Sequence, residues 1–151
     1  MAQNCLYAAR TAQDAQEAIA AGADIHANNN YALSWAAYKG RLEVVQFLLD
    51  HGAYIHAKND RVIRWAANCG HLEIVQFLLE RGANVRAEND AALRVAADAG
   101  QLETVKLLAF SYSRVELLAI QERINNDTLA EVIACHVPRG ARTKAALRNT
   151  E

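Results

Sequence analysis

The residues of this sequence best suited to binding a metal are its five histidines. Two of them, His26 and His56, occupy the same position in successive copies of a repeated segment, and the third copy carries Arg86 there. Stacked helix pairs lie about 10 Å apart, whereas zinc ligands bind within ~2.1 Å of the ion. One metal therefore cannot join the two imidazoles, and we interpret them as turn histidines hydrogen-bonded to the backbone. No metal site is predicted.

A cysteine nucleophile is the second candidate for chemistry. Cys69 precedes Gly70 at the predicted C-terminal end of a helix, where the helix dipole disfavours a thiolate. No fixed base accompanies this cysteine in the sequence. Cys5 and Cys135 are predicted to fill small spaces in the core. The three cysteines lie far apart without a CxxC pair, which fits reduced thiols and predicts a cytoplasmic location.

Catalytic and nucleotide-binding motifs are missing from the sequence. It contains no GxGxxG, GxxxxGK[ST], HExxH or GxSxG segment. We therefore predict a protein that is not an enzyme, uses no cofactor and acts on no small-molecule substrate.

Composition is typical of a soluble, mostly helical, intracellular domain. The chain has 151 residues, of which 52% are hydrophobic and 22% charged, so it can bury a core and is not disordered. A formal net charge of -1 argues against general binding to nucleic acids or membranes. The apolar runs are far shorter than the ~20 residues of a membrane span. The N-terminal residues MAQNCLYAAR lack the pattern of a secretory signal.

The sequence contains tandem copies of one segment, and the helices that position these residues must be built from them. Gly22, Gly52 and Gly82 recur every 30 residues, and Gly40, Gly70 and Gly100 do the same. Agreement at a fixed period indicates a repeat architecture. The copies read GADIHANNNYALSWAAYKGRLEVVQFLLDH (22–51), GAYIHAKNDRVIRWAANCGHLEIVQFLLER (52–81) and GANVRAENDAALRVAADAGQLETVKLLAFS (82–111).

Each copy is predicted to form two short helices. In the first copy an inner helix runs from Tyr31 to Lys39 and ends at Gly40, which tolerates a left-handed backbone. An outer helix begins near Leu42, and its apolar residues fall on one stripe that must be buried. The residues predicted to cap the inner helices at their N-terminal ends are Asn30, Asp60 and Asp90.

A helix pair of this kind cannot bury its apolar stripe alone, so neighbouring pairs must stack into a solenoid. We predict one all-α domain over residues 1–151. Residues 1–21 form a degraded cap repeat, with Leu6 to Ala12 as its inner helix. Residues 112–151 form irregular capping helices, including one from about Ser113 to Ile124 and an inner helix from Thr128 to His136, followed by a basic tail.

The repeats resemble those of the ankyrin family. The segments GADxHA and LxWAAxxGHLEVVxxLLxxG carry the resemblance between Gly22 and Ser111. The family's usual unit is ~33 residues with a T-P-L-H motif, and the copies here are three residues shorter and lack that motif. Similar short units occur in bacterial, phage and giant-virus proteins. The resemblance implies stacked helix-turn-helix repeats with short hairpin-like turns and a non-catalytic role in binding other proteins.

The inner helices present one face away from the outer helices, and solenoid curvature makes such a face concave. Stacking should align Ser34, Arg64 and Arg94 in one column and Trp35, Trp65 and Val95 in another. The aromatic column either packs the repeats together or anchors a partner. The arginines either pair with Asp60 and Asp90 or bind carboxylates or phosphates of a partner. The predicted partner-binding residues are Tyr31, Ser34, Trp35, Tyr38, Lys39, Arg61, Arg64, Trp65, Asn68, Arg94 and Asp98.

The leading functional hypothesis is a small intracellular binding protein or inhibitor. A chain without a second domain to deliver favours an inhibitor or host-interaction factor over an adaptor, by analogy with the family. The expected partner is another protein, and the arginines suit an acidic surface. The alternative is binding to nucleic acid or nucleoprotein through Arg61, Arg64, Arg94 and the tail of residues 138–151, which carries a net charge of +3. The competing interpretation of that tail is a solvated capping helix.

Overall fold

The computed structural model describes residues 1–135, and this part of the chain consists of ten α-helices without a β-strand. The prediction of an all-α fold is therefore confirmed. The helices are α1 (Ala2–Ala8), α2 (Ala12–Ala20), α3 (Ala27–Tyr38), α4 (Leu42–Asp50), α5 (Ala57–Cys69), α6 (Leu72–Glu80), α7 (Ala87–Asp98), α8 (Leu102–Ala109), α9 (Arg114–Ile124) and α10 (Asp127–Cys135).

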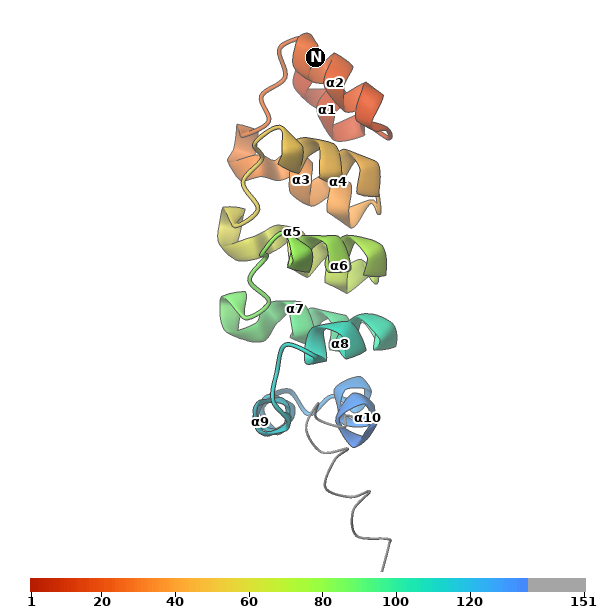
Figure 1. Cartoon of the computed structure of the whole chain (residues 1–151), viewed down its shortest axis with the longest axis vertical. Coiled ribbons are helices and arrows are strands. Elements are labelled where there is room, and N and C mark those ends of the chain that lie inside the picture. The colour runs from red at the N-terminus through yellow and green to blue at the C-terminus, as the bar shows by residue number, and fades with distance from the viewer. Residues whose placement is uncertain (136–151) are drawn as a thin grey trace, which may run out of the picture.

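The helices form one elongated stack of pairs (Figure 1). The inner helices α1, α3, α5 and α7 pack on one another, and the outer helices α2, α4, α6 and α8 form a second row beside them. A continuous apolar core runs between the two rows. Its centre holds the fully buried residues Leu33, Leu48, Ile63, Leu78, Leu93 and Leu108. The stack is the solenoid that the repeat period predicts.

The inner helices of the three repeats begin with an unusual turn. Residues 28–30, 58–60 and 88–90 lie in the left-handed region, with φ between 53° and 62°. Right-handed helix therefore starts at Tyr31, Arg61 and Ala91, where the sequence predicted it. The prediction that residues 30, 60 and 90 are N-caps is wrong, because an N-cap residue has an extended backbone and no side chain caps these helices.

The side chains at the ends of these turns join neighbouring repeats instead. Oδ1 of Asn30 accepts a hydrogen bond from the backbone N–H of Tyr54 at 2.8 Å. In the next repeat, Oδ1 of Asp60 accepts from the N–H of Asn84 at 2.7 Å. Both acceptor residues are buried. Each one satisfies a donor in the turn of the following repeat, where a lost hydrogen bond is costly.

The repeated histidines complete these contacts. Nδ1 of His26 lies 3.2 Å from Oδ1 of Asn30, and Nδ1 of His56 lies 2.9 Å from Oδ1 of Asp60. The predicted structural role agrees with these contacts, but the predicted backbone partner is wrong. The left-handed turn brings the side chain four residues later to the imidazole, so that side chain is the partner.

A second set of side chains links each outer helix to the preceding repeat. Nε2 of His71, at the start of α6, lies 3.0 Å from the carbonyl oxygen of Tyr38, at the end of α3. Nε2 of Gln101 reaches the carbonyl of Asn68 in the same way. Gly40 has φ 73°, and a Cβ there would lie 2.7 Å from Cε1 of His71. The positive φ therefore favours glycine, and the imidazole of His71 would have to move to admit a side chain there.

The N-terminal pair differs from the prediction in its boundary. Ala12 was expected in the inner helix, but it is the first residue of α2. Thr11 explains the difference, because its side chain accepts from the N–H of Asp14 while the Asp14 carboxylate accepts from the N–H of Thr11. This reciprocal capping box starts a new helix at that point.

The C-terminal pair departs from the regular stack. Helix α9 lies where the sequence predicted it, but α10 packs on α8 and so takes the outer position. The prediction of an inner helix from residue 128 is therefore wrong, because α10 lies next to the outer helix α8 and α9 lies beside α10 (Figure 1). Both helices are seen end-on in Figure 1, whereas the others lie across the view.

Tyr112, at the position of the repeated glycine, closes the third repeat. Its hydroxyl donates to Oδ1 of Asp90 at 2.9 Å and lies 3.2 Å from the carbonyl oxygen of Val85. Burial, followed by the hydrogen bond to Asp90, raises the pKa of the Tyr112 phenol above its ordinary value. The Tyr112 ring therefore covers this end of the core, and its phenol is uncharged.

An ion pair fastens α9 to the third repeat. Oε1 of Glu116 accepts from Nη1 of Arg86 at 2.7 Å, and Oε2 accepts from the N–H of Ser113 at 2.7 Å. The Arg86 hydrogen bond, with those from Ser113, lowers the pKa of Glu116 from its ordinary 4.5 to about 2. The carboxylate thus serves both the helix cap and the link between repeats.

Glu116→Gln is expected to remove part of the acid sensitivity of folding. Because the folded-state pKa is depressed, the contribution of the carboxylate is complete above pH 4.5 and is lost as the pH falls toward about 2. Urea midpoints of the wild type and the variant should therefore converge as the pH falls through this interval. A midpoint difference that stays constant with pH contradicts the assignment.

Residues 136–151 lie outside the described part of the chain, and so do the predicted helix end at His136 and the basic tail. Within residues 1–135, no helix combines the length and the apolarity needed to cross a membrane.

Candidate functional site

Aromatic rings from two successive inner helices gather on one face. The ring of Trp35 stacks on Tyr31 at 6.0 Å and on Tyr38 at 5.3 Å between centroids. Trp65, from α5, meets Tyr31 and Tyr38 edge-on at 6.0 and 5.7 Å. These four residues form the aromatic cluster. The rings thus contribute to packing between repeats, as one of the two interpretations of the sequence proposed.

A groove of about 470 Å³ opens beside the aromatic cluster. It crosses α3, α5 and α7, so three repeats contribute to its wall. The residues that line it are Trp35, Tyr38, Lys39, Arg64, Trp65, Asn68 and Val95. Its apolar wall comes from Trp35, Trp65 and Val95, and its polar edge comes from Lys39, Arg64 and Asn68. The groove therefore offers an outside molecule both apolar surface and hydrogen-bond donors.

Lys39 covers one side of this groove. Its Nζ lies 4.5 Å from the centroid of the Trp35 ring and 5.0 Å from that of Tyr38. A cation over an aromatic face is attracted by the ring quadrupole. The ammonium group is thereby held at the groove, although Lys39 is itself exposed.

Arg61 lies against the aromatic cluster and makes its contacts within the protein. Its guanidinium lies 5.5 Å from the Tyr31 ring and 5.3 Å from the Trp65 ring. Its Nε donates to Oγ of Ser34 at 3.1 Å. Burial lowers the pKa of Arg61 below its ordinary value, and the nearby charge of Arg64 lowers it further. Ser34 is only 2% exposed, so of the predicted partner-binding residues it is one that a partner cannot reach.

Arg64 and Arg94 occupy equal positions in successive repeats and make equal contacts. Nη2 of Arg64 donates to the carbonyl of Lys58 at 2.9 Å, and Nη2 of Arg94 donates to that of Glu88 at 3.4 Å. Pairing with Asp60 and Asp90 was the internal alternative for these arginines, and the structure shows backbone carbonyls of the left-handed turns instead. The Nε atom of each is buried without a hydrogen-bond partner among residues 1–135.

Tyr38, Asn68 and Asp98 occupy equal positions in successive repeats but have different surroundings in the structure. Tyr38 and Asn68 line the groove. Asp98 is exposed but lies outside the groove lining, and its Oδ1 accepts from Nδ2 of Asn126 at 3.0 Å. Tyr31, Arg61 and Arg94 also lie outside the lining. The structure thus brings together six of the predicted partner-binding residues. It adds Val95, which the sequence had placed in one column with Trp35 and Trp65.

The histidines and cysteines that the sequence offered for metal binding or nucleophilic chemistry do not line the groove. Among residues 1–135, no group of three or more His, Cys, Asp or Glu side chains is placed to hold a metal ion. Cys69 is half-buried at the end of α5, and the described cysteines are free thiols. Cys5 and Cys135 are exposed, so their prediction as core residues is wrong.

Comparison with protein families decides the relationship of the chain. Residues 33–79 match a family described as ankyrin repeats (many copies), and residues 58–119 match one described as ankyrin repeats (3 copies). The chain belongs to the ankyrin repeat family. The two matches together span most of the three repeats and the start of α9. No curated protein matches the chain.

Ankyrin repeats are in general modules for protein–protein interaction. In this ankyrin repeat protein, the sequence did not reveal the links at Asn30, Asp60, His71 and Gln101. Their recurrence at equal repeat positions was the available signal. Without the backbone conformation, however, a recurring polar residue does not show whether it bonds within its own repeat or to the next.

Proposed function

We propose that this ankyrin repeat protein is a non-catalytic binding module that holds another protein on its inner-helix face. The observation that supports this proposal is the groove where Trp35, Trp65 and Tyr38 meet Lys39 and Arg64. Tryptophan, tyrosine and arginine are the residues that most often carry the binding energy of protein interfaces. A partner held there has part of its own surface covered, so the proposed action is inhibition.

The interior of the cell is the proposed place of action. Cys5 and Cys135 are exposed free thiols, and the cysteines of residues 1–135 form no disulfide. Exposed unpaired thiols persist in reducing compartments and are oxidised outside them. An intracellular protein of the host or of the source cell is therefore the expected partner.

The inner-helix arginines favour a protein over a nucleic acid. Arg61 is bound to Ser34 and to two rings, while Arg64 and Arg94 each donate to a backbone carbonyl. Affinity for nucleic acids comes mainly from several cations that are free to contact phosphates. The groove lining has two cations, Lys39 and Arg64, which can hold a single carboxylate but are few for a phosphate backbone, and the basic tail lies outside the described residues.

Trp65→Ala is expected to reduce capture of the partner at least tenfold. Truncation of a central interface tryptophan commonly costs more than ~2 kcal/mol of binding free energy. The immobilised wild type and the variant are incubated with a lysate of the source cells, and the captured proteins are compared by quantitative mass spectrometry.

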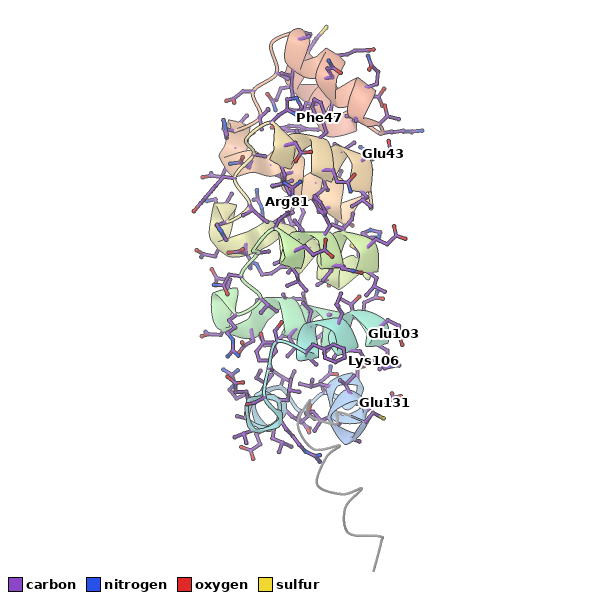
Figure 2. The ribbon with its side chains drawn as sticks, in the orientation of Figure 1. Glu43, Phe47, Arg81, Glu103, Lys106 and Glu131 are labelled. Carbon is purple, nitrogen blue, oxygen red and sulfur yellow. The ribbon has the colours of Figure 1, made fainter. Side chains whose placement is uncertain are left out.

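Lys106→Glu is the control for this experiment, because Lys106 is exposed on α8 and pairs with Glu103 at 2.7 Å (Figure 2). It should capture as much partner as the wild type does. Circular dichroism and thermal melting check that each variant is folded. Equal capture by folded Trp65→Ala, or retention of the wild type on DNA or RNA at physiological salt in place of a protein, contradicts the proposal.

A further inference from the structure

The groove contains positive charge that the protein itself does not neutralise. No carboxylate belongs to its lining, which includes Lys39 and Arg64. Among residues 1–135, neither of these cations makes an ion pair; Lys39 lies over aromatic rings and Arg64 bonds to a carbonyl. Asp98, the one predicted partner-binding residue with a carboxylate, lies outside the lining and bonds to Asn126. The charges in the groove therefore lack an anionic partner within the described protein.

The remaining surface has the opposite sign. Without Lys39 and Arg64, residues 1–137 carry 10 Lys and Arg against 16 Asp and Glu, a net charge of 10 − 16 = −6. Figure 2 shows Glu43 and Glu131 along one edge of the outer helices, where Glu103 is paired with Lys106. An acidic segment approaching the protein is repelled by this side and attracted by the groove, since complementary potentials steer association. Charge thus selects both the kind of partner and the face it meets.

We propose that the groove binds a short acidic segment of a partner protein, with an apolar side chain against Trp35, Trp65 and Val95 and a carboxylate at Lys39 and Arg64. This inference rests on the proposed protein-binding function and specifies the chemistry of the partner. The groove of about 470 Å³ holds a few side chains and not a whole interface. The segment is therefore the anchor of a larger contact.

A cationic ligand does not fit the same groove. Aromatic rings can surround a methylated lysine or another quaternary ammonium ion. Here the ammonium of Lys39 already lies over the rings of Trp35 and Tyr38. A second cation would meet that charge and the guanidinium of Arg64 without any groove carboxylate to offset the repulsion. The rings therefore favour an apolar neighbour of the carboxylate.

A nucleobase is also a poor occupant. Bases bind single-strand proteins by stacking on free aromatic faces. The ring of Trp35 is stacked on both Tyr31 and Tyr38, and Lys39 lies over it as well. Trp65 meets its neighbours edge-on and also contacts the guanidinium of Arg61. These internal contacts occupy the ring faces that a stacked base needs, whereas an apolar side chain can pack against any exposed part of the rings.

The test uses the full chain to select the short peptides that bind to it. A random peptide library displayed on phage is panned against the immobilised wild type after depletion on Trp65→Ala. The enriched peptides should contain Asp or Glu next to a large apolar residue. Synthetic, fluorescently labelled copies of these peptides serve as the probes, and fluorescence anisotropy measures their affinity. Enrichment of basic or uncharged peptides, or no enrichment, overturns the inference.

Charge reversal at an exposed groove residue provides the sharper measurement. Lys39→Glu should weaken binding of the selected peptide about tenfold, whereas the matched change Lys106→Glu on the outer face should leave the affinity unchanged. A peptide whose carboxylate is replaced by Lys should lose affinity for the wild type and regain it with Lys39→Glu. Because Lys39 is exposed, this variant is expected to fold, which thermal melting verifies.

The acidic segment and the protein-binding face can be contradicted by different results. If selected peptides bind Lys39→Glu and the wild type equally, the acidic segment is excluded. Protein binding at the inner face is still supported in that case if a lysate protein is captured by the wild type and lost with Trp65→Ala. Capture that is insensitive to both variants overturns the binding face itself.

Discussion

Asp60→Ala is expected to lower the free energy of unfolding by about 3 kcal/mol. Asp60 is 4% exposed, and its carboxylate accepts from the N–H of Asn84 at 2.7 Å and from the imidazole of His56 at 2.9 Å. Losing a hydrogen bond to a charged group costs about 1.5–3 kcal/mol. The backbone at residue 60 has φ 56°, and alanine in that conformation adds roughly 1–2 kcal/mol. Urea unfolding of both proteins measures the difference.

Two further changes at this position separate the causes. Asp60→Asn should retain most of the stability, because Asn30 makes the same contact with Tyr54 in the preceding repeat. Asp60→Gly should recover only the backbone part of the loss, because glycine tolerates positive φ but provides no acceptor. If Asp60→Ala and Asp60→Asn are equally stable, the hydrogen bond between repeats does not contribute as assigned.

Leu48→Ala is expected to lower the free energy of unfolding by about 2–5 kcal/mol. Leu48 is fully buried in α4, where the inner and outer rows meet. Truncation leaves a cavity whose walls relax only in part, so both the transfer free energy and the packing are lost. The stability of a stacked repeat also depends on its neighbours, so the loss should be seen in the unfolding of the stack.

Leu72→Ala provides the comparison, since Leu72 begins α6 and is 39% exposed. Its effect should be below ~1 kcal/mol, because much of that side chain is already in water. Denaturant midpoints, with slopes checked for two-state behaviour, measure both variants. A negligible shift for Leu48→Ala would place the core elsewhere than between the two rows.

The path of the chain was largely predictable from the repeat. The glycines at positions 40 and 70 have positive φ at the predicted inner-helix ends, and the right-handed helix starts where the sequence predicted. Both features depend on local preferences of a few neighbouring residues, which a 30-residue period shows three times over. At the ends, where the repeat is broken, the same reasoning misplaced Ala12 and the position of α10.

The members of the candidate site were predicted less completely. Helical spacing placed Trp35, Tyr38, Trp65 and Asn68 on one face, and these residues do line the groove. It could not show that Arg61 folds over Ser34 and buries it. An arginine side chain reaches several neighbours, and its position depends on which acceptors the packed repeats present. Whether the groove residues bind a partner stays a prediction.

The sequence by itself determined the two-helix unit, its repetition and the face that each inner-helix residue occupies. These features follow from backbone preferences and a helical period of 3.6, which act over a few residues. The tertiary structure decided how the polar side chains are satisfied. Asn30 and Asp60 bond to residues 24 positions ahead, and His71 bonds to one 33 positions behind. Contacts at such separations exist only once the repeats are stacked, so no local pattern specifies them.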